Sequence, residues 1–292
     1  MARYAKITIA FGRRGVGKSI ETIDTIYDYV LNSPKRKALI FDVNDEFGKF
    51  TYKDGRVHEI KAIYIRDIPK FGAQKFPEIR RIRPYWDNNI PMTPADMNEV
   101  LYIIFSNYRD GLLLAEDITL YTADNMKRDL VGTMATIRQK GIDLILHYQM
   151  IKKAGNPTLL ALANFFRIHK TQDTVARHAE KFDDKAEMMM IAQDIVNTRY
   201  KWAINQEPKI KTNYGMFFSV FVDVDEMKIK GQFSGKEANH AVLRYINTEP
   251  KILMNALKER DIYGNKKYTD RQDALRKLSK ELMEEYFVFD KE

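Results

Sequence analysis

Two features that many proteins have are missing from this chain of 292 residues. It contains no cysteine, which excludes disulfide bonds and thiolate metal sites and indicates a reducing compartment. Its apolar runs all fall short of the roughly 18–20 residues that cross a bilayer. The N-terminal MARYAKITIAFG leads into an expected strand rather than a cleavable signal. We therefore expect a soluble, cytoplasmic protein without lipid insertion.

Acidic residues are in deficit, because 48 Lys and Arg outnumber 40 Asp and Glu and give a net charge of +8. The isoelectric point is near 9.3. A basic balance is compatible with a polyanionic partner, although charge alone is not diagnostic of one. Hydrophobic residues make up 45% of the chain, which is enough for a buried core.

Strand and helix patterns alternate through the first half of the chain. Helical patterns cover Ser19–Leu31, Pro94–Asn107 and Thr122–Lys140, the last two beginning at threonine caps. This alternation predicts an α/β fold with a mainly parallel sheet flanked by helices. Short apolar runs between polar turns predict its strands: Ile7–Phe11, Ala38–Val43, Leu112–Ala115, Asp143–Leu146 and Phe165–His169.

The second half has a different character. The stretch GMFFSVFVDVDEMKIKGQF predicts two strands joined by an acidic turn, within the main sheet or as a hairpin beside it. From residue 236 onward the pattern is helical and highly charged. We expect a core at residues 1–235 and a C-terminal helical segment at 236–292. The proline-containing stretch at 69–94 predicts an irregular excursion.

The stretch FGRRGVGKS, residues 11–19, matches the phosphate-binding pattern G-x-x-x-x-G-K-[ST] in full. Glycines let backbone N–H groups surround phosphates, Lys18 supplies positive charge, and the Ser19 hydroxyl can ligate Mg²⁺. The following helix adds its N-terminal dipole. The alternative is a glycine-rich turn that binds nothing. The sequence predicts that the whole loop binds nucleotide: Gly12, Arg13, Arg14, Gly15, Val16, Gly17, Lys18 and Ser19.

An acidic pair, Glu116 and Asp117, follows the expected strand in GLLLAEDIT. One carboxylate there can hold Mg²⁺ while its neighbour polarises the attacking water. The alternative is an acidic pair that starts a helix. We therefore expect catalytic carboxylates at the carboxyl end of this strand.

A polar residue, Gln149, ends the strand pattern in IRQKGIDLILHYQ. Ligands of open parallel sheets lie beyond the carboxyl ends of the strands, so Gln149 should face the γ-phosphate. A glutamine that merely begins a loop is the alternative. The stretch FDVNDEFG brings Asp42, Asn44 and Glu46 to the same edge, without a defined role.

The order of these elements resembles the FtsK/HerA superfamily of P-loop motors, which pump or package double-stranded DNA and include viral genome-packaging ATPases. The resemblance covers roughly residues 5–185 and includes RQKGIDLILHYQ and ANFFRIHKTQDTVARHAEKF. It implies a RecA-like P-loop NTPase core with ATP and Mg²⁺ as cofactors.

The resemblance also implies a role for each matching residue. Lys18 would contact phosphate, whereas Ser19 and Glu116 would hold Mg²⁺. Asp117 would be the catalytic acid and Gln149 the sensor. The family usually has Asp followed by Glu, and the reversed order in this sequence puts a shorter acid second and predicts slow turnover.

Members of this family usually work as rings in which an arginine of one subunit completes the next active site. Arg138 is the first candidate, followed by Arg109 and Arg167. A hexameric or pentameric ring would hold double-stranded DNA through sequence-independent basic contacts. The basic runs that could supply them, unless they are ordinary solvated charge, are residues 35–37, 80–86 and 152–153.

The leading interpretation is an ATP-hydrolysing motor that translocates or packages double-stranded DNA, from a virus or mobile element, in host cytoplasm or the virion. One alternative is a zonula-occludens-toxin-like phage assembly ATPase, which normally carries a membrane-spanning segment. Others are a nucleoside or small-molecule kinase with a lid at 66–86, and a module that binds nucleotide with little hydrolysis. The C-terminal helices would pack on the core, dock a neighbouring subunit, or bind a portal, capsid or membrane protein.

Overall fold

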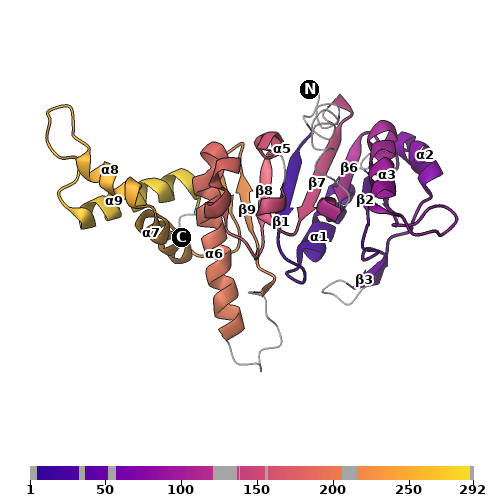
Figure 1. The fold of residues 1–292 in the computed structure, drawn as a ribbon, viewed down its shortest axis with the longest axis horizontal. Helices are drawn as coiled ribbons and strands as arrows, with labels where there is room; N and C mark the ends of the chain where they lie inside the picture. Colours follow the sequence, from indigo (N-terminus) through magenta and orange to yellow (C-terminus); the bar gives the residue numbers. More distant parts are fainter. Residues whose placement is uncertain are drawn as a thin grey trace. The chain divides into compact units, whose positions relative to one another are not determined.

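The computed structural model describes residues 5–32, 37–51, 57–120, 137, 139–154, 157–205 and 216–289. The chain divides into two compact units. The first comprises residues 1–165 and 171–173, and the second comprises 166–170 and 174–292 (Figure 1). The expected boundary at residue 235, between a core and a C-terminal helical segment, stays a prediction.

A mainly parallel sheet organises the fold, with the strand order β10-β9-β8-β1-β7-β6-β2-β5. In the first unit, β1 pairs with β7, β7 with β6, β6 with β2 and β2 with β5, all in parallel. In the second unit, β9 and β10 pair in antiparallel fashion. The strands are β1 (Ile7–Phe11), β2 (Ala38–Phe41), β5 (Ile79–Ile82), β6 (Gly111–Ala115), β7 (Ile142–Tyr148), β8 (Phe165–Ile168), β9 (Val220–Asp223) and β10 (Lys228–Lys230).

Helices connect and flank these strands. Those of the first unit are α1 (Lys18–Leu31), α2 (Ile68–Ala73), α3 (Pro94–Asn107) and α5 (Pro157–Leu162), and β3 (Lys49–Thr51) pairs with β4 (Val57–Glu59) in a separate small sheet. Those of the second unit are α6 (Ala186–Asn205), α7 (Gly235–Thr248), α8 (Pro250–Lys258) and α9 (Arg271–Tyr286). Short 3₁₀ turns are η1 (Ile65–Asp67), η2 (Ile118–Leu120), η4 (Ile151–Lys153), η5 (Val175–Lys181) and η6 (Asp183–Lys185).

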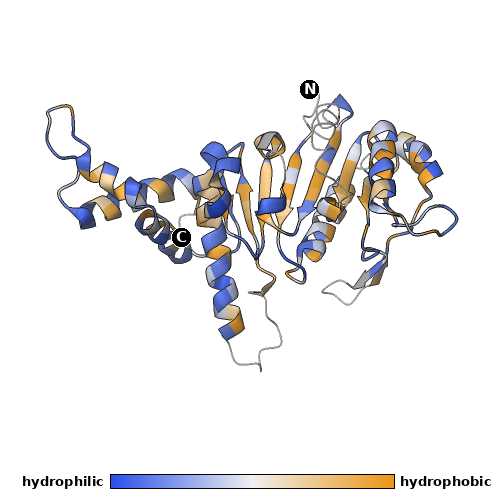
Figure 2. Cartoon of the chain, in the orientation of Figure 1, coloured by the Kyte–Doolittle hydropathy of each residue, from blue (hydrophilic) through white to orange (hydrophobic). Residues whose placement is uncertain are grey.

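The core of the first unit forms where apolar helix faces meet the apolar strands. One face of α1, with Ile23, Ile26 and Val30, packs in a buried cluster with Ile40 of β2 and Leu114 of β6. Figure 2 shows the central strands of the first unit mainly in the hydrophobic colour. Strands buried on both faces lack polar alternation, which explains why the sequence reveals these strands as continuous apolar runs.

The structure confirms the predicted α/β class, a RecA-like core with helices flanking a mainly parallel sheet. Thr93 caps α3, because its hydroxyl accepts from the Asp96 N–H while the Asp96 carboxylate accepts from Thr93. The acidic-turn strands are β9 and β10, and they belong to the main sheet. Most of the predicted helix at 122–140 lies outside the described residues. Within the described part of the chain, no helix is long and apolar enough to span a membrane.

One prediction about the fold is wrong. The stretch at 69–94 is not an irregular excursion throughout, because it contains α2 and the sheet strand β5. Strand β5 pairs with β2 in parallel, with Phe41 opposite Ile82. Two arginines in its four residues, IRRI, hide it from a search for apolar runs.

Candidate functional site

The loop between β1 and α1 has the backbone that its glycines allow. The Gly12 N–H donates to the Tyr148 carbonyl at 3.0 Å, which ties the start of the loop to the end of β7. Gly15 and Gly17 have φ angles of 74° and 85°, in the left-handed region that favours glycine. Gly17 precedes α1 directly. The N–H groups at the start of this 14-residue helix therefore open toward the loop.

Lys18 lies over this loop. Its ammonium donates to the Gly12 carbonyl and, at 3.0 Å, to the Arg13 carbonyl. Burial lowers the pKa of Lys18, and the charges of Asp117 and Glu116 act in the opposite direction. The lysine is therefore a half-buried cation that faces the predicted acidic pair.

The other loop residues differ in exposure. Ser19, in the first turn of α1, and Arg13 are half-buried, whereas Arg14 is exposed. Val16 is buried and holds the loop on the core. The loop thus offers a serine hydroxyl and two arginines beside Lys18.

The acidic pair is buried at the carboxyl end of β6. Glu116 and Asp117 are each only 4% exposed. Burial raises the pKa of Glu116 to about 8, and the nearby carboxylates of Asp42 and Glu46 add to the effect, which hydrogen bonds from Asn44 oppose. Carboxylates in this position are not solvated surface, and the structure does not continue them into an α-helix but into the 3₁₀ turn η2.

The structure brings Asp117 and Gln149 together. The Gln149 amide donates to one Asp117 oxygen, and the Thr119 hydroxyl donates to the other at 3.1 Å. The contact arises because β6 and β7 are parallel neighbours, with Ala115 opposite Leu146. Asp117 has a φ of 40°, an uncommon conformation for a residue other than glycine. Lys18, Asp117 and Gln149 thus meet at one edge of the sheet.

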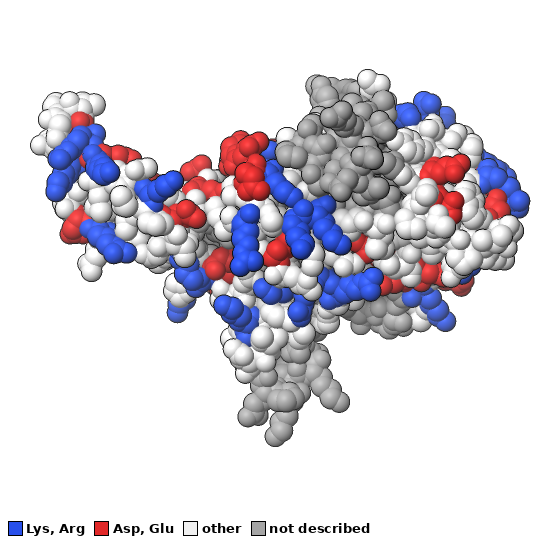
Figure 3. Space-filling model, in the orientation of Figure 1, with Lys and Arg blue, Asp and Glu red and all other residues white. Residues whose placement is uncertain are grey.

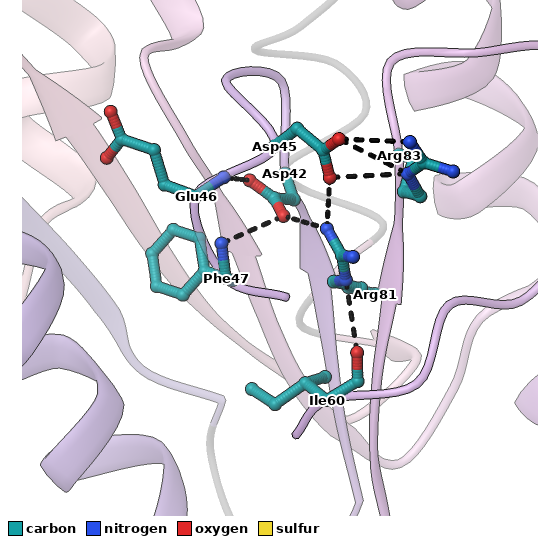
Figure 4. Close-up of polar contacts among 7 residues, drawn as sticks. All are labelled: Asp42, Asp45, Glu46, Phe47, Ile60, Arg81 and Arg83. Carbon is teal, nitrogen blue, oxygen red and sulfur yellow. Dashed lines mark hydrogen bonds and ion pairs between the residues drawn. The ribbon is translucent and has the colours of Figure 1, made fainter. Parts of the chain in front are cut away.

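The loop after β2 is shaped by a buried ion-pair network that sequence reasoning missed (Figure 4). Asp42, fully buried, accepts from the N–H groups of Glu46 at 2.8 Å and Phe47 at 3.0 Å. The Arg81 guanidinium donates to Asp42 at 2.7 Å and also to Asp45. These contacts fix the loop that approaches Glu116.

Arg83 completes the network on its outer side. Its guanidinium lies 3.0 Å from an Asp45 oxygen. Hydrogen bonds from Arg83 and Arg81 hold the pKa of Asp45 below its usual value despite partial burial. Asp45 has a left-handed φ of 55°, and this turn places its carboxylate between the two arginines.

This arrangement changes the interpretation of two basic runs. The Arg81 side chain is only 13% exposed and forms ion pairs with Asp42 and Asp45, so it is not a surface contact for DNA. Lys37 is buried and donates to the Gln74 carbonyl at 2.8 Å. Lys152 and Lys153, in contrast, are exposed in η4 directly after β7.

The structure describes two of the three candidate arginines. Arg138 lies outside the described residues. Arg109 is exposed and precedes β6, so it lies at the opposite end of that strand from Glu116. Arg167, in β8, has its guanidinium 5.8 Å from the Phe221 ring centre. A role for any of them toward a neighbouring subunit stays a prediction.

A second buried polar contact lies under the loop. The His147 Nε2 and Thr22 Oγ1 atoms are 2.8 Å apart and link β7 to α1. The signal for it was a histidine inside the apolar run IDLILHY. This contact fixes α1, whose first turn carries Lys18 and Ser19, against the strand that leads to Gln149.

The residues at this edge suit Mg²⁺ bound together with phosphate rather than a closed protein cage. Among the described residues, no cluster of three or more His, Asp or Glu has the arrangement of a metal centre. Mg²⁺ commonly uses one or two protein oxygens and completes its shell with water and phosphate. Ser19 and Glu116 are such hard oxygen donors, and a cation would compensate for the burial and the carboxylate repulsion that together raise the pKa of Glu116.

The fold and the loop together are of the RecA-like P-loop type. No family model matches the chain, and no curated protein matches its sequence. Among solved structures it is similar to the genome packaging NTPase B204 from Sulfolobus turreted icosahedral virus 2 in complex with ATP-gammaS, at 17% identity over 78% of this chain and 96% of that one, with a TM-score of 0.48.

Two further structures are similar at a lower level. B204, the DNA-packaging ATPase from Sulfolobus Turreted Icosahedral Virus, shares 15% identity over 77% of this chain and 95% of that one, with a TM-score of 0.45. The N-terminal domain of zonular occludens toxin from Neisseria meningitidis shares 16% over 58% of this chain and 79% of that one, with a TM-score of 0.35.

Proposed function

We propose that this chain binds ATP in the loop at residues 12–19 and hydrolyses it at the adjoining acidic edge. The observation that carries the proposal is the meeting of Lys18, Asp117 and Gln149, which come from α1, β6 and β7. One site then contains a cation to bind phosphate (Lys18), a carboxylate to orient water (Asp117) and an amide to sense the loss of the γ-phosphate (Gln149). A glycine-rich turn without a ligand would not require buried charges beside it.

The loop and Lys18 supply the binding energy for the phosphates. Backbone N–H groups at the N-terminus of α1 are unsatisfied donors, and the helix dipole favours negative charge there. Lys18 already lies over this position. Its pKa, lowered by burial, returns toward the ordinary value when a phosphate lies beside it.

Ser19 and Glu116 are the residues that would hold Mg²⁺. When bound with ATP, the ion neutralises charge on the phosphate oxygens. The loop after β2, which carries Asp42 and Glu46, places further negative charge near Glu116. This charge strengthens the attraction for a cation. Asn44 and the Arg81 network keep this loop in place.

Asp117 is the proposed catalytic carboxylate and acts as a general base. It orients a water and takes a proton from it as the water oxygen bonds to the γ-phosphorus and the bond to the ADP oxygen breaks. Gln149 holds the carboxylate from β7 and is the proposed sensor of phosphate loss. Asp117, the second acid of the Glu116–Asp117 pair, has a shorter side chain than a glutamate at that position, and this supports slow turnover.

We further propose that hydrolysis drives the translocation or packaging of double-stranded DNA by a homo-oligomeric ring. The order of motifs and the net charge of +8 support this cargo. Lys152 and Lys153 are the favoured phosphate contacts, because they are exposed just beyond the sensor strand. Arg138 is the first candidate for the arginine that completes a neighbouring site, and a portal, capsid or membrane protein is a further candidate partner.

The test is steady-state ATP hydrolysis with and without long double-stranded DNA, at low salt and at about 0.2 M, where phosphate contacts weaken. The proposal predicts stimulation by DNA that fades with salt. A matched comparison is the double variant Lys152→Ala, Lys153→Ala, which should lose stimulation but keep basal hydrolysis. Measurable hydrolysis that DNA never stimulates would contradict the motor and favour an assembly ATPase activated by another partner.

One observation favours a second candidate, a module that binds nucleotide and scarcely hydrolyses it. In the structure Gln149 and Thr119 both donate hydrogen bonds to the Asp117 carboxylate. Burial raises the pKa of Glu116 to about 8, which favours its protonated form at neutral pH. A carboxylate held in this way would serve assembly rather than pumping. ATP binding with no turnover, in the presence and absence of DNA, would favour this candidate.

A further inference from the structure

The loop between α8 and α9 ends in two adjacent, exposed apolar side chains. Ile262 is 91% exposed and Tyr263 is 82% exposed. Figure 1 shows the segment as a loop that extends from the ends of the two helices. Single exposed apolar residues are common, but a neighbouring isoleucine and tyrosine at the end of a loop form a contact surface.

Hydrogen bonds hold this loop end in one conformation. The Asp261 carboxylate accepts from the N–H groups of Tyr263 and Asn265, both at 2.9 Å. The Asp261 N–H donates to the Asn265 carbonyl at 2.9 Å, and Gly264 turns the chain with a φ of 82°. A preorganised aromatic loses little entropy on binding.

The base of the loop is anchored to α9. Tyr268 is buried, and the Lys277 ammonium of α9 lies 5.7 Å from its ring centre. The Lys267 N–H donates to the Glu259 carbonyl at 3.1 Å, and Arg260 and Lys266 form a β-bridge. Tyr263 is therefore presented from a fixed stem.

The charges of the loop are not balanced. Its two acids are occupied, since Asp261 closes the turn and Glu259 pairs with Lys267 at 2.8 Å. The remaining cations are exposed and form no ion pair within the described residues: Lys258, Arg260 and Lys266. In Figure 3 cationic atoms lie beside uncharged atoms at the end of this loop. The surface matches a polyanion that also has apolar faces.

We propose that residues 258–267 form a binding element for exposed DNA bases. Tyr263 stacks on a base, Ile262 adds apolar contact, and the three unpaired cations hold the neighbouring phosphates. An apolar protein pocket would accept the tyrosine but would leave these cations without partners, so nucleic acid is the better match. The inference deepens the proposed function and rests on it, because it names a segment that would contact the DNA cargo where its bases are exposed, at a duplex end or in a single-stranded part.

Exposed bases occur in single strands and at duplex ends, and the experiment separates these sources. DNA affinity is measured for a short single strand, a blunt duplex and a relaxed closed circular duplex, without ATP. We expect Tyr263→Ala to weaken binding of the single strand about tenfold, and Tyr263→Trp to retain it. Equal loss for the blunt duplex would assign end binding as well, whereas the closed circle should bind unchanged.

Phe76→Ala is the matched control, because it removes a comparably exposed aromatic, 73% exposed, from the first unit. It should leave all three affinities unchanged. The inference is overturned if Tyr263→Ala binds single strands like the wild type, if the wild type does not bind them, or if the variant changes only self-association. Basal ATP hydrolysis and closed-circle binding by the wild type report on the proposed function separately.

Discussion

Two regions carry many ionisable residues: the sheet edge at β1, β6 and β7, and the helix α9. They differ in how far these residues are buried and how they are paired. At the edge, Lys18, Glu116 and Asp117 are buried or half-buried. On α9, Lys277 and Lys280 are exposed. Lys277 pairs with Asp273 at 2.9 Å and Lys280 pairs with Glu284 at 3.8 Å, each about one turn away. Burying charge costs several kcal/mol unless a partner compensates it, whereas exposed pairs contribute little. The first set indicates a ligand and the second a solvated surface.

The carboxyl pKa values show the same contrast. Burial raises the pKa of Glu116 to about 8. The Lys277 hydrogen bond and the Thr269 N–H lower the pKa of Asp273 to about 2. An acid that is unstable as an anion either stays protonated or binds a cation, whereas an acid satisfied by its neighbours stays ionised without one.

The largest expected effect is the loss of ATP binding in Lys18→Ala. Removing a charged hydrogen-bond donor from buried phosphate should weaken affinity about a hundredfold. Calorimetric titration with ATP and Mg²⁺ measures the change. Lys280→Ala, from α9, should bind ATP like the wild type. Equal affinities for Lys18→Ala and the wild type would remove Lys18 from the site.

The next effect concerns stability. Arg81→Met leaves Asp42 as a buried charge without its guanidinium partner, which should lower the free energy of unfolding by about 3–5 kcal/mol. The matched change on α9, Arg276→Met, should stay within about 0.5 kcal/mol. Urea denaturation compares them. Similar small losses in both would show that the Figure 4 network is not stabilising.

A third effect is the dependence of stability on pH, measured without divalent cations. The folded pKa of Glu116, about 8, exceeds the ordinary value of 4.5, so its contribution to stability is full below pH 4.5 and is lost as the pH rises through 8. Relative to Glu116→Gln, the wild type should lose a few kcal/mol over this window. Parallel stability curves for the two proteins would contradict this.

The smallest effect is expected on α9 itself. Lys280→Ala removes one exposed end of the Glu284 pair and should change the free energy of unfolding by less than about 0.5 kcal/mol. Added salt should reduce even this difference. A larger, salt-independent loss would mean that this face of α9 is not simply solvated.

The sequence predicted the part of the site that local patterns encode. A complete loop motif, an acidic pair after an apolar run and a glutamine after the next one suffice to predict the convergence of Lys18, Asp117 and Gln149. Parallel strands bring these residues to one edge without any knowledge of side-chain contacts. The predicted roles of these residues stay to be tested.

What the sequence did not predict depends on contacts between distant residues. Arg81 and Asp42 are 39 positions apart, and only the pairing of β2 with β5 shows that an arginine in a basic run is buried. The sequence does not reveal helix α6, because its buried residues include Met188, Gln193 and Tyr200 rather than one continuous apolar stripe. The contact of Thr22 with His147 likewise needs the packing of α1 on β7.

The central claim is that the acidic edge hydrolyses the ATP that the loop binds. It is tested most directly by ATP turnover of Asp117→Asn, with ATP affinity measured on the same preparation. The amide keeps an oxygen for Gln149 but cannot take a proton from water. We expect affinity to remain within about twofold of the wild type and hydrolysis to fall at least a hundredfold. Unchanged hydrolysis would contradict the assignment of Asp117 and, with it, the proposed mechanism.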